Sequence, residues 1–136
     1  MADVEARLAW TGEGLSFEGS AAGGPTVIVD GAGRAGPSPM QAIVLGVAAC
    51  TAADVVEILG KMRVGLDALE VRIDADRAPE PPRRYTRIRL VYRTRGVPAG
   101  EEDKLRRAVS LSHEKYCSAL HTLRPDVDVV TELALG

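Results

Sequence analysis

The chain has 136 residues, which suits one domain with a moderate core, and 46% hydrophobic with 26% charged residues is the balance of an ordinary globular protein. A formal net charge of −2 gives no bulk attraction to nucleic acid or to anionic membrane, so neither is expected as a partner. The longest apolar run, residues 42–50, is about half of the ~18 residues that a membrane span needs. The N-terminus lacks a basic region followed by an apolar stretch, so we predict a cytoplasmic location without a secretory signal.

Alternation of apolar and polar residues predicts three short strands at the N-terminal end. Residues 4–10 alternate with a period of two, which indicates a half-buried strand with Leu8 and Trp10 on its inner face. Turn residues follow at 11–14, and the alternation resumes from Leu15. A third strand is predicted at 26–29.

A long helix is predicted from Pro39 to about Arg63. Ser38 is suited to the N-cap and Pro39 to the first helical position. Residues 42–49 are apolar on nearly every side, and a helix that is apolar all round is buried all round. Because one sheet covers only one side of a helix, we expect a second copy of the chain to cover the other side, as a homodimer.

Two amphipathic strands, 69–76 and 87–95, are predicted to form a hairpin around the turn at 78–82. The second strand carries a row of arginines that invites a nucleic-acid interpretation. If the hairpin pairs residues whose numbers sum to about 163, opposite charges face each other. These pairs are Glu70 with Arg93, Asp74 with Arg89, and Asp76 with Arg87. The row is therefore interpreted as a solvated face.

The remaining segments complete an α+β arrangement. An amphipathic helix is predicted over 101–112, a bend over 113–116, a short helix over 117–123 and a final strand over 127–135. We predict a single domain, residues 1–136, of antiparallel sheet packed on helices.

The chain has two cysteines. Cys50 lies midway along the predicted long helix among small residues, where a substrate could approach the sulfur. Cys117 begins the predicted short helix, and a helix N-terminus stabilises a thiolate. In a reducing compartment two cysteines are not expected to form a structural disulfide, and most such cysteines are inert, so each one alone is weak evidence.

Two segments of the sequence resemble the OsmC (osmotically inducible protein C) and organic hydroperoxide resistance superfamily. The first comprises GPSPMQ at 36–41 and GVAACTAADVVEIL at 46–59, and the second is SHEKYCS at 112–118. The match is best with the OsmC-like bacterial branch, and the order of predicted elements agrees over the whole chain. The resemblance implies antiparallel sheets packed on a long central helix, in an intertwined homodimer with active sites at the subunit interface.

The resemblance also implies a thiol-dependent peroxidase that reduces organic hydroperoxides. Cys50 would attack the peroxide and become a sulfenic acid, and Cys117 would condense with it to form a disulfide. An external dithiol reductant would restore both thiols by exchange. No metal or organic cofactor is implied.

The sequence departs from the family at the start of the long helix. The hydroperoxide-resistance branch carries a Glu after the Pro, where this chain has Met40, and related branches carry Glu one residue later, where it has Gln41. No N-terminal position matches the arginine that pairs with that Glu, and only Arg7 and Arg34 are offered as substitutes. Without a cation, burial raises a thiol pKa and slows attack.

Two other interpretations remain open. Cys50, Cys117, His113 and His121 together would make a Cys₂His₂ set of the kind zinc accepts, although their spacing fits no compact zinc motif. For the histidines we otherwise expect a partly buried His121 and a surface His113. The second alternative is a non-enzymatic dimer that binds an apolar ligand at the subunit interface, which the replacement of the family Glu favours.

Overall fold

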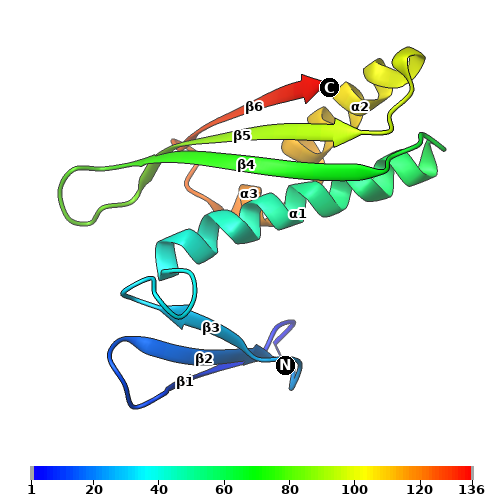
Figure 1. Cartoon of the computed structure of the whole chain (residues 1–136). Coiled ribbons are helices and arrows are strands. Elements are labelled where there is room, and N and C mark those ends of the chain that lie inside the picture. The colour runs from blue at the N-terminus through cyan, green and yellow to red at the C-terminus, as the bar shows by residue number, and fades with distance from the viewer. Residues whose placement is uncertain (1, 136) are drawn as a thin grey trace. The chain divides into compact units, whose positions relative to one another are not determined.

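The computed structural model describes residues 2–135 (Figure 1). The chain forms two compact units, residues 1–45 and 46–136. One continuous helix, α1 (Pro39–Lys61), runs from the first unit into the second. The single-domain assignment of 1–136 stays a prediction.

The N-terminal unit contains a three-stranded antiparallel sheet in the order β1-β2-β3, which confirms the three predicted strands. The strands are β1 (Ala6–Trp10), β2 (Ser16–Ala21) and β3 (Val27–Asp30). The expected half-burial of β1 is wrong for the single chain, because Leu8 and Trp10 are 62% and 61% exposed. A single three-stranded layer has no second layer of its own to cover a face.

The loop after β3 is organised by the buried carboxylate of Asp30. Asp30 accepts hydrogen bonds from the backbone N–H groups of Ala32 (2.9 Å), Arg34 (3.2 Å) and Ala35 (2.9 Å). The bonds from Ala35 and Ala32, aided by that from Arg34, lower the pKa of this carboxyl. The next residue, Gly36, passes so close to Ile28 that a Cβ would collide with its carbonyl oxygen.

A reciprocal cap starts α1. The Ser38 hydroxyl oxygen accepts from the Gln41 N–H (3.1 Å), and the Gln41 side-chain oxygen accepts from the Ser38 N–H (2.9 Å). This is a capping box, with Pro39 at the first helical position, and it confirms the predicted helix start. The Gln41 side chain is therefore occupied by the helix end rather than by a thiol.

By length and composition, α1 could cross a membrane. The longest unbroken apolar run did not predict this, because the ability to cross depends on the mean hydropathy of a window of 18 residues. One face of the helix is nevertheless buried in protein: Thr51, Val55 and Leu59 are 0–1% exposed. We therefore describe α1 as a core helix.

The larger unit contains a second three-stranded sheet, in the order β4-β5-β6. Its strands are β4 (Ala68–Arg77), β5 (Tyr85–Arg95) and β6 (Asp128–Leu135). The hairpin register is confirmed, with Glu70 opposite Arg93, Asp74 opposite Arg89 and Asp76 opposite Arg87. The prediction of antiparallel sheets needs one correction, because β6 runs parallel to β5. Parallel neighbours need a crossover connection, and here helices supply it.

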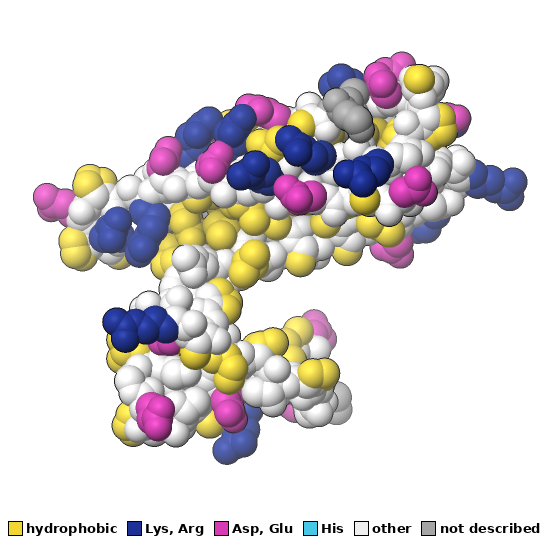
Figure 2. Space-filling model, viewed as in Figure 1, with side chains coloured by type: hydrophobic (Ala, Val, Ile, Leu, Met, Phe, Trp, Pro, Cys, Tyr) yellow, Lys and Arg dark blue, Asp and Glu magenta, His cyan; other side chains and the backbone are white. Residues whose placement is uncertain are grey.

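The outer face of this sheet is solvated and charged. Arg89 donates to Asp74 on β4 (2.9 Å) and, through two nitrogens, to Glu132 on β6 (2.9 and 2.6 Å). One guanidinium thus bridges all three strands. Figure 2 shows basic and acidic side chains intermingled over the larger unit, as expected for a solvated face.

Helices connect β5 to β6. The 3₁₀ turn η1 (Ala99–Glu101) leads into α2 (Glu102–Leu111), which is followed by one π-helical turn, η2 (Ser112–Tyr116), and by α3 (Ser118–Thr122). The predicted helix, bend and short helix are confirmed. The core combines the inner face of β5 with the buried faces of α1 and α2, and its members include Val55, Leu59, Ile88, Leu90, Tyr92, Leu105, Ala108 and Val109.

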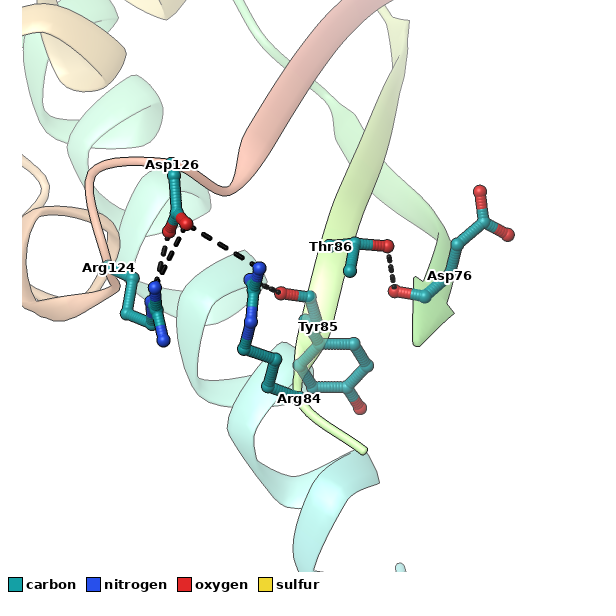
Figure 3. A network of polar contacts seen from close by, with 6 residues as sticks. All are labelled: Asp76, Arg84, Tyr85, Thr86, Arg124 and Asp126. Carbon is teal, nitrogen blue, oxygen red and sulfur yellow. Dashed lines mark hydrogen bonds and ion pairs between the residues drawn. The ribbon is translucent and has the colours of Figure 1, made fainter. Parts of the chain in front are cut away.

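A polar network ties the start of β5 to the turn before β6 (Figure 3). Asp126 accepts two hydrogen bonds from Arg124 (3.0 Å each) and forms an ion pair with Arg84 (3.5 Å). Arg84 also donates to the carbonyl oxygen of Tyr85 (3.2 Å), and Thr86 donates to that of Asp76 (3.3 Å). The Arg84–Asp126 ion pair thus joins the end of the helical crossover to the start of β5.

Candidate active site at Cys50 and Cys117

The two cysteines meet inside the larger unit. Cys50 lies on α1 and is half-buried, whereas Cys117, between η2 and α3, has no exposed surface. Both thiols are free. The two Sγ atoms and a carboxylate oxygen of Asp54 all lie within 4.8 Å of one another. Residues that are 67 positions apart in the sequence (117 minus 50) therefore form one cluster.

Helix α1 presents Cys50 and Asp54 on the same face because residues four apart are neighbours on a helix. Between them Thr51 is fully buried, and its hydroxyl donates to the carbonyl oxygen of Ala48 (3.1 Å). Thr51 also hydrogen-bonds Tyr92 of β5, whose phenol is 1% exposed. Burial raises the pKa of Tyr92, and this hydrogen bond opposes the rise. The phenol is therefore neutral at physiological pH.

The π-helical turn η2 positions the second half of the site. The Cys117 N–H donates to the Ser112 carbonyl oxygen (2.8 Å), five residues back, and both residues are 0% exposed. The Ser112 hydroxyl then donates to Asp54 on α1 (2.8 Å), which joins elements 58 residues apart. Single π turns inside helical segments often occur at functional sites. Here the wide turn directs a serine and a cysteine toward the same carboxylate.

The environment of Cys117 keeps its sulfur protonated. Burial raises the pKa of this thiol to about 11, and the proximity of Cys50 and Asp54 adds to the rise. The Leu120 N–H, which donates to Sγ at 3.3 Å, opposes the rise and is outweighed. Cys117 does cap the short helix α3, as expected, but the predicted stabilisation of its thiolate is wrong because desolvation is the larger effect.

A surface hollow of about 410 Å³ adjoins the cluster, with Asp54 in its wall. Most of its remaining lining is apolar or aromatic, including Ile58, Met62, Leu111 and Tyr116. A hollow of about 520 Å³ on the β4-β5-β6 sheet is lined by no residue of the cluster. The hollow beside Asp54 has no cysteine in its wall but shares Asp54 with the cluster, so it is the one considered for thiol chemistry.

Two sulfurs and one carboxylate oxygen are ligands that a zinc ion accepts. Within the described residues, the cluster includes neither His113 nor His121, so the Cys₂His₂ set is not assembled. The expected burial of the histidines was reversed. His121 is exposed, with Nε2 3.1 Å from the His113 carbonyl oxygen, and His113 is half-buried.

Sequence reasoning did not identify Asp54, Ser112 or Tyr92 as site residues. The spacing of Cys50 and Asp54 was a usable signal, because helical neighbours four apart share a face. Ser112 lies inside the second family motif but carried no chemical clue of its own. The substitutes offered for the family arginine, Arg7 on β1 and Arg34 in the loop after β3, belong to the N-terminal unit, and their role stays a prediction.

Comparison with known proteins agrees with this architecture. The family model described as OsmC-like protein matches residues 31–132. Protein YhfA of Escherichia coli (strain K12) is 38% identical over 127 residues, which cover 93% of each chain. A hypothetical protein from Aquifex aeolicus VF5 superposes with a TM-score of 0.86 at 26% identity, covering 100% of this chain and 98% of that one.

Two solved structures whose names mention organic hydroperoxide resistance share the fold. OhrB of Bacillus subtilis has a TM-score of 0.65 at 20% identity, and a protein of Legionella pneumophila named OsmC has 0.68 at 18%. The alignment covers 98% of both chains in each case. The resemblance noted in the two sequence motifs is thus confirmed over most of the chain, and the protein belongs to the OsmC-like family.

Proposed function

We propose that this protein is a cytoplasmic, homodimeric thiol peroxidase that reduces organic hydroperoxides through Cys50 and Cys117. The observation that carries the proposal is the pair of free thiols, whose Sγ atoms lie within 4.8 Å despite their distance in sequence. Their unequal burial supports different roles for the two cysteines in the reaction. The half-buried Cys50 can meet a substrate first, and the fully buried Cys117 acts second.

In the first step the Cys50 thiolate attacks one peroxide oxygen. An S–O bond forms, the O–O bond breaks, and the leaving alkoxide takes a proton and departs as an alcohol. The products are an alcohol and Cys50 sulfenic acid, and the peroxide has been reduced by two electrons. The apolar and aromatic part of the adjoining hollow, formed by Ile58, Met62, Leu111 and Tyr116 beside three charged residues, favours an alkyl or lipid hydroperoxide over hydrogen peroxide.

In the second step the Cys117 sulfur attacks the Cys50 sulfenic sulfur, and the hydroxyl leaves as water. A rotation of the two side chains closes the remaining gap to disulfide distance, about 2.05 Å. An external dithiol then reduces the disulfide by exchange through a mixed disulfide. Atoms and electrons balance without a metal or cofactor.

The names of the two hydroperoxide-resistance neighbours agree with this proposal, although at 18–20% identity they share the fold alone. Support for the dimer comes from the exposed side of α1. Leu45 and Val56 are 50% and 51% exposed, and Ala49 lies on the same stripe. An apolar stripe opposite the buried one is what a second copy of the chain would cover.

Thiol titration tests the proposal. We expect one equivalent of an alkyl hydroperoxide to remove two titratable thiols per chain, and a dithiol to restore both. Cys117→Ser should form the sulfenic acid, which a 1,3-dione reagent traps, and should then stall without the dithiol. Cys50→Ser should leave the Cys117 thiol unreacted, because that thiol is buried and protonated.

The same titration addresses the alternative of a non-enzymatic binding protein. That alternative is favoured by Gln41, whose side chain caps α1 where other branches carry an acidic residue. Thiols that survive excess organic hydroperoxide would support the binding protein and exclude the peroxidase.

A further inference from the structure

The resolving step has a proton to move. Cys117 enters the reaction as a thiol, because burial raises its pKa to about 11. The hydroxyl on the Cys50 sulfenic acid must leave as water rather than as hydroxide. One proton therefore has to travel from the Cys117 sulfur to that oxygen. Because Cys117 has no exposed surface, bulk water cannot carry the proton.

Asp54 is the group placed for this transfer. Its carboxylate lies within 4.8 Å of both sulfurs, a separation that one bridging water spans. The Ser112 hydroxyl donates to one carboxylate oxygen of Asp54 at 2.8 Å and so orients the group. Ser112 and Cys117 close the same π turn, so the serine that orients the carboxylate also belongs to the element that carries the thiol.

We propose that Asp54 takes the proton from the Cys117 thiol as its sulfur attacks, and delivers it to the hydroxyl that leaves the Cys50 sulfenic acid. Ser112 acts as the positioning residue. An S–S bond forms, the S–O bond breaks, water departs, and Asp54 returns to its carboxylate form. The inference rests on the proposed peroxidase function.

Other titratable groups near Asp54 are less suited. They are Cys50, Glu57 and Lys61 on α1, Tyr92 on β5, Tyr116 on η2, and Cys117 itself. Tyr92 is a neutral phenol whose pKa is raised, so it accepts a proton poorly. Lys61 is a cation, and Tyr116 is 50% exposed. Glu57 is exposed and does not belong to the cluster of the two sulfurs.

The test is a single-turnover measurement of disulfide formation in Asp54→Asn. Sulfenic acid formation is timed separately in the same variant, so that any effect on the first step is subtracted. Disulfide formation from the sulfenic acid is expected to slow about 100-fold at pH 7, the usual scale of acid–base catalysis. The rate in the variant should rise about tenfold per pH unit from pH 6 to 9, since only the rare Cys117 thiolate reacts. The wild-type rate should stay nearly flat over this range.

A purely electrostatic role for Asp54 predicts the opposite sign. The negative charge of Asp54 contributes to the raised pKa of Cys117, so its removal would lower that pKa and speed disulfide formation. A rate in Asp54→Asn that is unchanged or faster, with the pH profile of wild type, overturns the inference. If wild type loses no thiols to an alkyl hydroperoxide and Cys117→Ser forms no sulfenic acid, the peroxidase proposal itself has failed instead.

Two further variants complete the experiment. Asp76→Asn makes the same chemical change on an exposed position of β4 and should alter neither step. Ser112→Ala keeps the carboxylate but removes its hydrogen bond, so disulfide formation should slow about tenfold while the flat pH profile remains. If Asp54→Asn does not fold, an unchanged disulfide rate in a folded Ser112→Ala overturns the positioning role.

Discussion

At the scale of single residues, two cysteines of one chain differ in what their surroundings allow. Cys50 lies half-buried on a helix face, and Cys117 is sealed from solvent beneath a turn. Burial makes the neutral thiol the stable form of Cys117. In the proposed peroxidase reaction, a buried thiol of this kind is protected from direct oxidation and reacts only once a sulfenic acid forms beside it. The proton of this thiol must be removed during the attack, and Asp54 is the group that we propose to accept it.

The raised pKa of Cys117 predicts how stability changes with pH. Its pKa is about 11 in the folded chain, against a reference value of 9.0, so the neutral thiol favours folding below pH 9 and this contribution is lost as pH rises to about 11. Between pH 8 and 11 the free energy of unfolding should fall about 2 kcal/mol more in wild type than in Cys117→Ala. Urea unfolding under reducing conditions measures this.

The control for that comparison is Cys50→Ala, which retains the buried Cys117. Over the same pH range this variant should lose more stability than Cys117→Ala but less than wild type, because Cys50 contributes to the raised pKa of Cys117. Equal slopes for wild type and Cys117→Ala would show that the thiol titrates at its ordinary pKa.

At the scale of elements, the N-terminus of α1 stabilises the helix, and the middle of α1 carries the residues of the candidate site. Its N-terminus is closed by the capping box of Ser38 and Gln41, and its middle presents Cys50 and Asp54 to the π turn η2. Gln41, at a position where related branches carry Glu, caps the N-terminus of α1 in this chain. The carboxylate beside the two sulfurs is that of Asp54, one helical turn after Cys50.

Substitutions at Gln41 test this separation of duties. Gln41→Ala removes half of the capping box and should reduce the free energy of unfolding by about 0.5–1 kcal/mol. Gln41→Glu keeps the reciprocal bond and adds a negative charge near the positive end of the helix dipole, which should raise stability by about 0.3–1 kcal/mol. Urea unfolding measures both changes. The rate of peroxide-dependent thiol loss should match wild type in each, and a faster rate in Gln41→Glu would contradict a purely structural role.

At the scale of the whole molecule, much apolar surface of the single chain is exposed. Besides Leu8 and Trp10 on β1, the helix α1 exposes Leu45 and Val56. Positions 45, 49, 53 and 56 follow helical spacing, with alanine at the two central ones, so a second backbone can approach closely. Monomeric proteins rarely leave an apolar helix stripe of this kind uncovered.

We therefore expect Val56→Asp to weaken the proposed homodimer by at least 100-fold, because the new charge would have to be buried without a partner. Analytical ultracentrifugation over a range of concentrations measures the change. Arg107→Asp introduces the same residue at an exposed position of α2 and should leave the dimer intact. A wild-type chain that sediments as a monomer, or a Val56→Asp variant as dimeric as wild type, would rule out α1 as the interface.

The secondary elements, the register of the β4-β5 hairpin, the start of α1 and the family could all be predicted from the order of the amino acids. These features depend on short-range periodicity, on charge pairs across one turn and on the chemistry of Ser38 and Pro39. The parallel pairing of β6 and the contact between Ser112 and Asp54 were decided only by the tertiary structure. Local pattern carries no information on how residues 58 apart meet, and the protonated state of Cys117 follows from burial that only the packed core creates.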